Sequence, residues 1–455
     1  MNLKKILAGL DEIKAKGEID REVTTIENDS RKVVEGSMFF AIKGFSTDGT
    51  QYIQSAIEKG AKVILVDEQT DFRSLNIPQD VTLIVVKDAR YAMAICACNF
   101  YDNPSRKFKL IGVTGTKGKT TTTFMMREIF QKQGIKAGLI GTIAVYSGDK
   151  KLKDSDRTTP ESIELQQLFA QMYEDGCKVV IMEVSSQSLK LNRVAGCDFD
   201  VAVFTNFSED HISAKEHPNM EDYFNSKLKL FQMCKCGFVN IDDLHVCKVP
   251  KLFPDSDIKT YGIDNSCNLL AKDITITNSY VDFKVKLGDR NERVKVGIPG
   301  RSELVNNSKD LTIMIDYAHS PESLSNILHA VKSYTRGRVI SVFGCGGDRD
   351  SAKRPQMGEI SGMVADFTII TSDNPRTEDP QKIVDQIEEG IKKTKGKYTV
   401  IVDRVEAIRY AINMASKKDI IVLAGKGHEP YQEINGVKHP FDERVIVNQI
   451  IKGEL

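Results

Sequence analysis

The sequence predicts an α/β protein of three domains. Short apolar runs typical of buried strands alternate with helical segments along most of its length. A chain of 455 residues also exceeds the size at which a single hydrophobic core stops growing. A glycine-rich turn at residues 115–121 lies between one apolar run and a helical pattern, which is the local order of a phosphate-binding loop. We therefore expect mostly parallel sheets with ligand residues at the carboxyl ends of their strands.

The composition favours a cytoplasmic protein without a large charged surface. The 63 basic residues equal the 63 acidic residues in number, so no overall field attracts nucleic acid. The nine cysteines lack the paired spacing of a zinc site or an extracellular disulfide framework, and we expect reduced thiols. No apolar run approaches the length of a membrane span. Asp11 and Glu12 cut short the apolar stretch at the N-terminus, so we expect an amphipathic helix there and not a signal peptide.

The first domain is expected at residues 1–104. The runs 63–66 and 83–86 predict buried strands, and residues 52–59 predict a helix between turns. A turn-forming Asn-Pro-Ser segment at 103–105 predicts the linker to the next domain.

The second domain is expected at residues 105–300, as a mostly parallel, doubly wound sheet. Strands are predicted at 110–113, 138–141, 179–182 and 201–204. Glu183 and Asn206 each come just after an apolar run, where strand-end ligands belong. Residues 255–297 lose the alternation and predict a β-rich side structure.

The third domain is expected at residues 301–455, as a second βαβ array. Its predicted strands are 311–315, 338–343, 367–371, 398–402 and 420–423. Four of these five runs lead into polar clusters of Gly, Asp or His, and Asp316 directly follows the first.

The turn at 115–121 predicts a nucleoside triphosphate site. Inward backbone N–H groups and the helix dipole bind phosphate, a lysine reaches the phosphates, and a hydroxyl binds Mg²⁺. The pattern is shorter than a full Walker sequence, because Val113 stands where the first glycine would be. The residues of this loop are Gly115, Thr116, Lys117, Gly118, Lys119, Thr120 and Thr121.

Two acidic or polar clusters in the second domain have alternative interpretations. Glu183 ends a buried strand and can hold Mg²⁺ against the nucleotide, or it can simply cap the following helix. His211 has an acid and an amide nearby, which suits a ligand contact and equally a surface histidine. The local pattern around Lys227 is that of an ordinary solvated lysine.

The third domain offers groups of both charges at strand ends. Arg349 and Arg376 lie on neighbouring loops and can hold carboxylates bidentately, although Asn374-Pro375 is also a plain turn. Glu429, after the glycines of the last loop, adds a carboxylate. This combination predicts a zwitterionic ligand such as an amino acid.

The chain carries, in order, the motifs GTKGKTTT, TTPE, MEVSS, TNFSEDH, SKLKLF, DYAHSPESL, GCGGDRD, DNPRTEDP and AGKGHE. In this order they resemble the Mur ligase family over nearly the whole chain, and most closely its branch that adds 2,6-diaminopimelate to a UDP-N-acetylmuramoyl dipeptide. The resemblance implies an N-terminal UDP-binding domain, a central ATPase domain and a C-terminal Rossmann-like domain for the amino acid. It implies that ATP phosphorylates the D-glutamyl carboxylate and that the amine of the amino acid attacks the acyl phosphate, for the synthesis of peptidoglycan precursors.

The resemblance also implies roles by position. For ATP it implies the loop residues together with Arg301 and Asp316. For catalysis it implies Lys119, Glu183, His211 and Lys227, and for Mg²⁺ it implies Thr120, Glu183, His211 and a carbamylated Lys227. For the UDP-linked substrate it implies Ser30, Thr158, Thr159, Ser185 and Arg193. For the amino acid it implies Arg349, Asp373, Asn374, Pro375, Arg376, Gly425 and Glu429.

Two of these implications go beyond any local pattern. Only the resemblance supports a role for Lys227. Arg376 matches the family's marker for meso-diaminopimelate over lysine, since lysine has no second carboxylate to pair with an extra guanidinium. The resemblance further implies a cytoplasmic monomer that binds neither nucleic acid nor membrane.

The sequence departs from the family at the end of the second domain. There the family has an Asn-rich helix and further helices between two glycine turns, whereas here residues 297–300 run straight into Arg301. We expect the loss to uncover one face of the middle sheet and to remove an asparagine near the adenine.

Two alternatives to the ligase remain. One is a non-catalytic paralogue that binds the UDP-linked substrate or the amino acid without turnover. The other is a ligase similar to folylpolyglutamate synthetase, which shares the short phosphate loop, although Ser30-Arg31 and the Asp373–Arg376 loop argue against it.

Overall fold

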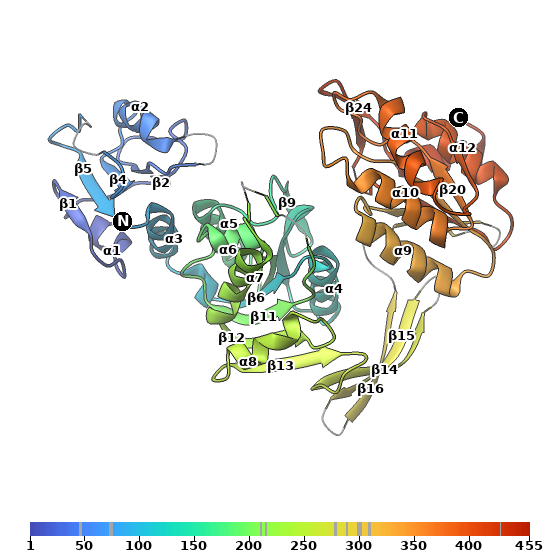
Figure 1. Cartoon of the computed structure of the whole chain (residues 1–455). Coiled ribbons are helices and arrows are strands. Elements are labelled where there is room, and N and C mark those ends of the chain that lie inside the picture. Colours follow the sequence, from blue (N-terminus) through green and yellow to red (C-terminus); the bar gives the residue numbers. More distant parts are fainter. Residues whose placement is uncertain are drawn as a thin grey trace. The chain divides into compact units, whose positions relative to one another are not determined.

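The computed structural model of the protein describes residues 1–44, 48–71, 76–209, 212–213, 216–276, 280–287, 290–297, 303–307, 311–427 and 429–455. The chain divides into two compact units, each considered by itself below. The first unit comprises Met1–Ala271 and Lys286–Arg290, and the second comprises Lys272–Val285 and Asn291–Leu455. Figure 1 shows the elements in chain order by colour.

The first unit begins with a sheet in the order β1-β5-β4-β3-β2, in which only the β1–β5 pair is antiparallel. Leu65 and Ile84 of its inner strands are fully buried, as the apolar runs predict. The elements are α1 (Leu3–Ile6), β1 (Lys14–Lys16), β2 (Ile26–Glu27), β3 (Met38–Phe40), η1 (Gly49–Tyr52), α2 (Ile53–Glu58), β4 (Val63–Asp67), β5 (Thr82–Val86) and α3 (Ala89–Phe100).

The same unit continues with a larger sheet, whose strands run β13-β12-β11-β6-β10-β7-β8-β9 and are parallel from β13 to β7. Its strands are β6 (Lys109–Thr114), β7 (Ala137–Ile140), β8 (Ala144–Ser147), β9 (Lys150–Asp154), β10 (Val179–Glu183), β11 (Phe199–Phe204), β12 (Cys234–Asn240) and β13 (Asp257–Gly262). Its helices are η2 (Pro104–Arg106), α4 (Lys119–Lys132), α5 (Ser162–Glu174), α6 (Ser186–Lys190), α7 (Met220–Leu228), η3 (Lys229–Gln232), η4 (Val246–Lys248) and α8 (Val249–Leu252).

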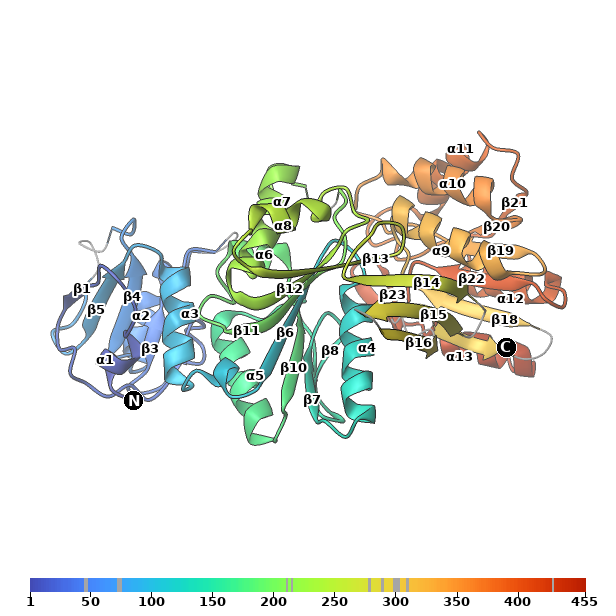
Figure 2. The same cartoon turned by 90° about the horizontal axis from the view of Figure 1, so that it is seen from below.

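The two faces of this larger sheet are covered unequally. One face carries a large core that includes Phe169 of α5 and Tyr223 of α7. On the other face α4 packs on β6, β7 and β10 (Figure 2). Beyond α4, Val201 of β11 and Phe238 of β12 are only partly buried.

Strands β14 (Leu269–Ile276), β15 (Tyr280–Leu287) and β16 (Arg290–Gly297) follow β13 and confirm the predicted β-rich segment. The boundary between the two units falls among them. Strand β17 (Glu303–Asn307) is the next described element.

The second unit has a sheet in the order β17-β18-β22-β19-β20-β21, parallel except for the β17–β18 pair. Its strands are β18 (Thr312–Asp316), β19 (Val339–Phe343), β20 (Phe367–Ile370), β21 (Tyr398–Val400) and β22 (Ile420–Ala424), with a separate hairpin of β23 (Tyr431–Ile434) and β24 (Val437–Pro440). Its helices are α9 (Pro321–Tyr334), α10 (Lys353–Val364), α11 (Pro380–Ile391), α12 (Arg404–Met414) and α13 (Glu443–Lys452).

Helices cover both faces of this second sheet. Helices α9, α10 and α11 lie on one side of the sheet and α12 and α13 on the other (Figure 2). Met314 belongs to the core formed with the first group, whereas its neighbours Ile313 and Ile315 belong to the core formed with the second. This alternation is the period of two expected for a strand buried on both sides. The predicted α/β class with mostly parallel sheets is therefore confirmed. In the part of the chain that the structure describes, no helix is long and apolar enough to cross a bilayer.

Candidate functional site

The glycine turn of the first unit has the backbone of a phosphate-binding loop. It joins the end of β6 to the first residue of α4, and Gly115 and Gly118 both have positive φ, +144° and +83°. A Cβ at Gly115 would lie 1.9 Å from Thr205 Oγ1, so only glycine fits. The N–H groups in the first turn of α4, which includes Thr121, lack helical partners and face an anion favourably.

The end of β11 braces this loop. Asn206 Oδ1 accepts a hydrogen bond from Lys117 N (2.9 Å), and Asn206 Nδ2 donates to Lys117 O (3.0 Å). Thr116 Oγ1 donates to Ser208 O (3.2 Å) and accepts from Ser208 N (3.0 Å). The polar cluster after β11 therefore fixes the loop geometry, while His211 of the same motif lies outside the described residues.

Two side chains at the start of α4 point back over the loop and toward β10. Lys119 Nζ donates to Gly115 O (2.9 Å) and Thr116 O (3.1 Å). Thr120 Oγ1 donates to Glu183 Oε2 (3.0 Å). Lys119 Nζ therefore lies over the loop, and the Thr120 hydroxyl lies beside the buried Glu183 carboxylate.

Glu183 is a fully buried carboxylate beside the loop. Its Oε1 accepts from Thr142 N (2.9 Å) and its Oε2 from Thr142 Oγ1 (3.0 Å), in addition to the bond from Thr120. Among the described residues it forms no ion pair, although a buried carboxylate is costly without a cation. Oxygen donors of this kind suit Mg²⁺, which takes few protein ligands and completes its shell with water and phosphate. No cluster of three His, Cys, Asp or Glu side chains spaced for a metal occurs in the described chain.

Lys227 lies in the same site, and the interpretation of its local sequence as a solvated lysine is wrong. Its side chain is only 1% exposed, its Nζ donates to Gly115 O (3.0 Å), and it lies 4.3 Å from the centre of the Tyr223 ring. Tyr223, Ser226 and Lys227 form the buried stripe of α7, at a spacing of three and four residues. This helical spacing was the available signal that Lys227 shares a face with core residues.

Sequence reasoning missed His217, which is fully buried beside this site. Its Nδ1 is 2.6 Å from Asp222 Oδ2 and its Nε2 is 2.9 Å from Ser186 Oγ. Burial lowers the pKa of His217, and the hydrogen bond that its ring donates to Asp222 opposes that shift. Lys190 Nζ, at the end of α6, also donates to Asp222 (2.8 Å), so this group connects both ends of α6 to the start of α7. No local pattern distinguishes such a histidine from an exposed one.

The residues expected to bind the dipeptide part of the UDP-linked substrate lie around the end of β10. Thr159 Oγ1 donates to Glu183 O (2.9 Å) and accepts from Ser185 N (3.1 Å). Thr158 Oγ1 is 3.1 Å from Thr142 Oγ1, the hydroxyl that contacts Glu183. Arg193 Nη1 donates to Thr159 O (3.3 Å). The structure thus brings these four predicted residues together next to the phosphate loop.

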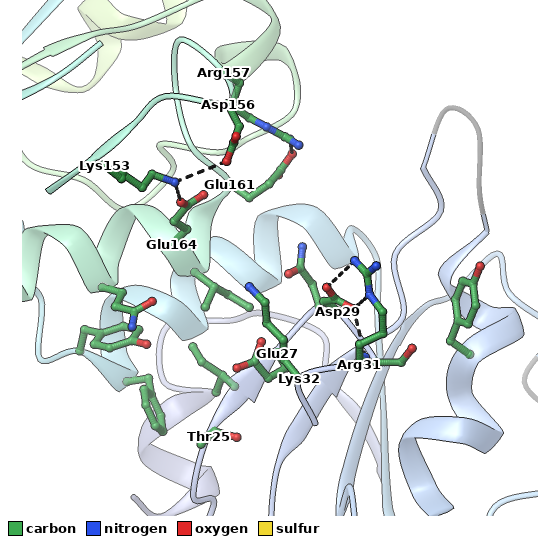
Figure 3. Close-up of a pocket in the computed structure, with 18 residues that line it drawn as sticks. Thr25, Glu27, Asp29, Arg31, Lys32, Lys153, Asp156, Arg157, Glu161 and Glu164 are labelled. Atoms are coloured by element: carbon green, nitrogen blue, oxygen red, sulfur yellow. Dashed lines mark hydrogen bonds and ion pairs between the residues drawn. The ribbon is translucent and has the colours of Figure 1, made fainter. Parts of the chain in front are cut away.

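A cavity of about 1010 Å³ opens in the first unit, and Ser30 lines it. The labelled side chains in Figure 3 come from the segment around β2 and from the stretch that runs from β9 into the first turn of α5. Three aromatic residues, Tyr52, Phe100 and Tyr101, also line it and offer faces for stacking a planar ring.

Charged groups of both signs line this cavity and offer donors and acceptors to a polar ligand. Arg31 and Asp29 form an ion pair at 2.8 Å, and hydrogen bonding from Arg31 lowers the pKa of Asp29 to about 2. Glu161 accepts from both Arg157 (2.6 Å) and Arg193 (2.9 Å), which connects the cavity to the dipeptide residues. Figure 3 shows Lys32 and Lys153 on opposite sides of the same space.

In the second unit the loops after β20 and β22 converge as the sequence predicts. Asp373 and Asn374 are nearly buried, and Asn374 Nδ2 donates to Glu429 Oε2 (2.8 Å). Gly425 has φ +117°, and a Cβ there would lie 2.5 Å from Asp373 Oδ2. Gly425 N donates to Asp316 O (3.0 Å), so Asp316 contributes its main chain to this arrangement.

Arg376 and Arg349 lie near each other across the glycine loop after β19. A Cβ at Gly346 would lie 2.9 Å from Arg376 Nη1 and 3.8 Å from Arg349 Cγ. Arg376 Nη1 donates to Gly347 O (2.7 Å), and its Nε is 3.3 Å from Glu433 Oε2. A Cβ at Gly347 would meet the Pro375 carbonyl oxygen at 1.9 Å, so the two loops are in direct contact. Arg349 is exposed and forms no ion pair among the described residues.

Lys426 is the residue of this second site that sequence reasoning missed, although both flanking predictions, Gly425 and Glu429, are correctly near it. It is fully buried, and its Nζ donates to Asn374 Oδ1 (2.9 Å). Arg301, expected at the phosphates, lies outside the described residues. In the first unit the predicted residues lie at the phosphate loop with the neighbouring end of β10, and at the cavity lined by Ser30; in the second unit they lie on the loops after β19, β20 and β22.

Three family models match the chain. They are the Mur ligase family catalytic domain at residues 22–101, the Mur ligase middle domain at 113–308, and the Mur ligase glutamate ligase domain at 300–427.

Full-length relatives carry a ligase name. The chain is 45% identical to UDP-N-acetylmuramoyl-L-alanyl-D-glutamate--2,6-diaminopimelate ligase of Caldanaerobacter subterraneus subsp. tengcongensis, over 99% of each chain. It is 43% identical to the protein of that name from Clostridium botulinum, over 99% of this chain and 100% of the relative. A solved structure of that name shares 28% identity and a TM-score of 0.72, covering 100% of this chain and 99% of the other. The first alignment extends over 491 positions, more than the 455 residues present here, so that relative has residues without a counterpart in this chain.

Proposed function

Because this chain belongs to the Mur ligase family, ATP-dependent enzymes that form amide bonds, we propose that it joins meso-2,6-diaminopimelate to the D-glutamate of UDP-N-acetylmuramoyl-L-alanyl-D-glutamate. The observation that carries this choice of substrate is the 45% identity to a relative of that name over 99% of both chains. The product is a precursor of peptidoglycan, and we expect the reaction to take place in the cytoplasm on a monomer.

We assign one substrate to each predicted domain. Residues 1–104 hold the UDP end at Ser30, beside the stacking faces and cations of the cavity. Residues 105–300 hold the ATP phosphates and present the dipeptide through Thr158, Thr159, Ser185 and Arg193. Residues 301–455 hold the amino acid, with Arg301 and Asp316 directed to the nucleotide.

The phosphate loop binds the triphosphate in this proposal. Lys119 exchanges its two carbonyl acceptors for phosphate oxygens, because an ammonium gains more from an anion than from a neutral carbonyl. The N-terminus of α4 and the N–H groups of the loop stabilise the charge that develops on the transferred phosphoryl group.

Thr120 and Glu183 hold Mg²⁺, with His211 and a carbamylated Lys227 as the further ligands. When bound, the metal neutralises phosphate charge as the glutamyl carboxylate attacks. Carbamylation would convert the Lys227 ammonium, now bonded to Gly115 O, into an anion that favours a cation at the same position. Thr142 keeps Glu183 oriented through two hydrogen bonds.

The amino-acid site supplies specificity. Arg349 and Arg376 bind carboxylates, and Asp373 and Glu429 bind ammonium groups, with Asn374 beside them in a hydrogen bond to Glu429. The neutral amine that attacks the acyl phosphate gives a tetrahedral intermediate, which expels phosphate and leaves the amide. Two carboxylates and two amines on one substrate match groups of both charges on these loops.

The direct test is phosphate release from ATP by the purified full-length protein. We expect release only when the UDP-linked dipeptide and diaminopimelate are both present, with lysine or a folate substrate giving no comparable rate. Release with folate and glutamate instead would contradict the assignment. A non-catalytic protein is not favoured, since relatives at 41–45% identity over nearly the full length carry the ligase name.

A further inference from the structure

Lys426 is a buried cation surrounded by acceptors from two loops of the second unit. Its Nζ is 2.9 Å from Asn374 Oδ1, 3.6 Å from Asp373 Oδ1 and 3.9 Å from Glu429 Oε2. The centres of the Tyr431 and Phe441 rings lie 6.0 and 5.6 Å from Lys426 Nζ and form the apolar part of its surroundings. Burial lowers the pKa of Lys426, and the charge of Asp373 opposes that shift. A buried ammonium is costly unless it is paired, so this arrangement keeps the lysine in place.

The contacts of Lys426 decide which way the Asn374 amide points. Asn374 Oδ1 accepts from Lys426 Nζ and from Glu433 N, both at 2.9 Å. An ammonium and a backbone N–H can only donate, so the oxygen of the amide must face them. Asn374 Nδ2 therefore faces Glu429 and donates to its Oε2 at 2.8 Å.

This chain of bonds extends to the carboxylate expected to bind substrate. With Oε2 of Glu429 held by Asn374, Oε1 lies 3.5 Å from Tyr317 Oη. Lys426 also sets the charge of the group. Two carboxylates, Asp373 and Glu429, with one ammonium leave a single net negative charge, which complements one ammonium of a bound amino acid.

We propose that Lys426 is a positioning residue of the amino-acid site, which orients the Asn374 amide, and through it the Glu429 carboxylate, toward a substrate ammonium. The proposal rests on the proposed function for the identity of the amino acid. It goes beyond that function because Lys426 acts on the loops and does not itself contact the substrate.

The test replaces Lys426 with methionine, which preserves the length and the apolar stem and removes the charge and the donors. Lys438→Met is the matched control, because Lys438 lies on the exposed strand β24, 4.1 Å from the centre of the same Tyr431 ring. Binding of diaminopimelate is measured by titration calorimetry on the full chain, with the UDP-linked dipeptide and a non-hydrolysable ATP analogue present. Binding of the ATP analogue is measured separately.

We expect Lys426→Met to weaken diaminopimelate binding about tenfold or more, the effect of losing a charged hydrogen bond. Lys426→Met should bind the ATP analogue, and Lys438→Met should bind diaminopimelate, with affinities within about twofold of the parent. Neither of these two binding events depends on the hydrogen bond between Lys426 and Asn374. Unchanged diaminopimelate binding in folded Lys426→Met would overturn the proposal, as would equal losses for both ligands, which would indicate only a structural role.

A second variant covers the case in which Lys426→Met does not fold. Asn374→Asp keeps an acceptor for Lys426 but places a carboxylate against Glu429, so amino-acid binding should fall by a similar factor while the thermal midpoint stays near that of the parent. Tight diaminopimelate binding by Asn374→Asp would contradict the orienting role. Failure of the proposed function gives a different result, since the parent protein would then bind diaminopimelate without releasing phosphate, or would not bind it at all. The latter result would overturn the Lys426 proposal as well.

Discussion

Thr120 Oγ1 donates a hydrogen bond of 3.0 Å to Glu183 Oε2, and this bond connects the first turn of α4 to the end of β10. The two residues are 63 positions apart in sequence, yet they meet because β6 and β10 are parallel neighbours whose carboxyl ends share one edge. A hydroxyl and a buried carboxylate at a phosphate loop are the pair that a magnesium nucleotide needs.

Glu183→Gln should lower kcat by about 100-fold or more, because the amide keeps the shape of the side chain but not the charge that faces the metal and phosphate. The expected loss is measured as phosphate release across a range of Mg²⁺ concentrations. Glu174→Gln, at the exposed end of α5 in the same unit, is the control and should retain activity. A rate near that of the parent for Glu183→Gln would rule out a metal role for this carboxylate.

Lys119→Ala should weaken ATP binding by about 10-fold or more while leaving the UDP-linked dipeptide bound as before, because it removes only the ammonium over the loop. Lys132→Ala at the exposed far end of the same helix serves as the matched control. Nucleotide and dipeptide affinities are measured separately by calorimetry. Equal weakening of both ligands would mean that the variant disturbs the sheet and not the phosphate contact.

Arg376→Lys should raise the KM for diaminopimelate by about 10-fold or more and change the KM for ATP little, since lysine keeps the charge but loses bidentate geometry. The loss of the bond to Gly347 O also loosens the contact between the two loops. Arg336→Lys, at an exposed position of the same unit, is the control. If the KM for diaminopimelate and the KM for ATP rose by the same factor, the loop after β20 would not be the amino-acid site.

Acid should remove the stability that the ion pair between Arg354 and Glu378 contributes to the second unit. Hydrogen bonds from Arg354 lower the pKa of Glu378 from 4.5 to about 2. A depressed carboxyl pKa contributes stability that is complete above the unfolded value and is lost as pH falls toward the folded one. At neutral pH Glu378→Gln should cost about 1–2 kcal/mol, less than a fully buried pair because Glu378 is 34% exposed while Arg354 is 1% exposed.

This cost should shrink as the pH falls from about 4.5 toward 2. The measurement is the thermal midpoint of parent and variant at neutral pH and at several acidic values. Asp385→Asn, at an exposed position of α11, should give no such convergence. A difference between parent and Glu378→Gln that is constant with pH would contradict the role of this ion pair.

The sequence was sufficient to predict the fold and the phosphate loop, because both depend on local patterns. Apolar runs such as that of β10 are readable as buried strands, and the position of Glu183 at a strand end follows from the topology rule. Gly115 and Gly118 could be identified because their backbone conformation requires glycine.

The buried cations could not be predicted in the same way. Lysine is rarely buried, so the local pattern around Lys227 suggested an exposed residue. Lys426 was assigned no function, although it stands between two predicted ligand residues. Their burial depends on partners distant in sequence, such as Gly115 for Lys227 and Asn374 for Lys426. His217 is similar, since Ser186 and Asp222 approach it only in the folded chain.

The measurement that tests the central claim most directly follows an oxygen atom from substrate to product. The UDP-linked dipeptide is prepared with a heavy oxygen isotope in the D-glutamyl carboxylate and turned over with ATP and diaminopimelate, and the released phosphate is analysed by mass spectrometry. Activation as an acyl phosphate predicts that each released phosphate carries one oxygen from the labelled carboxylate. Phosphate without the label would show that ATP is hydrolysed by water and would contradict the account.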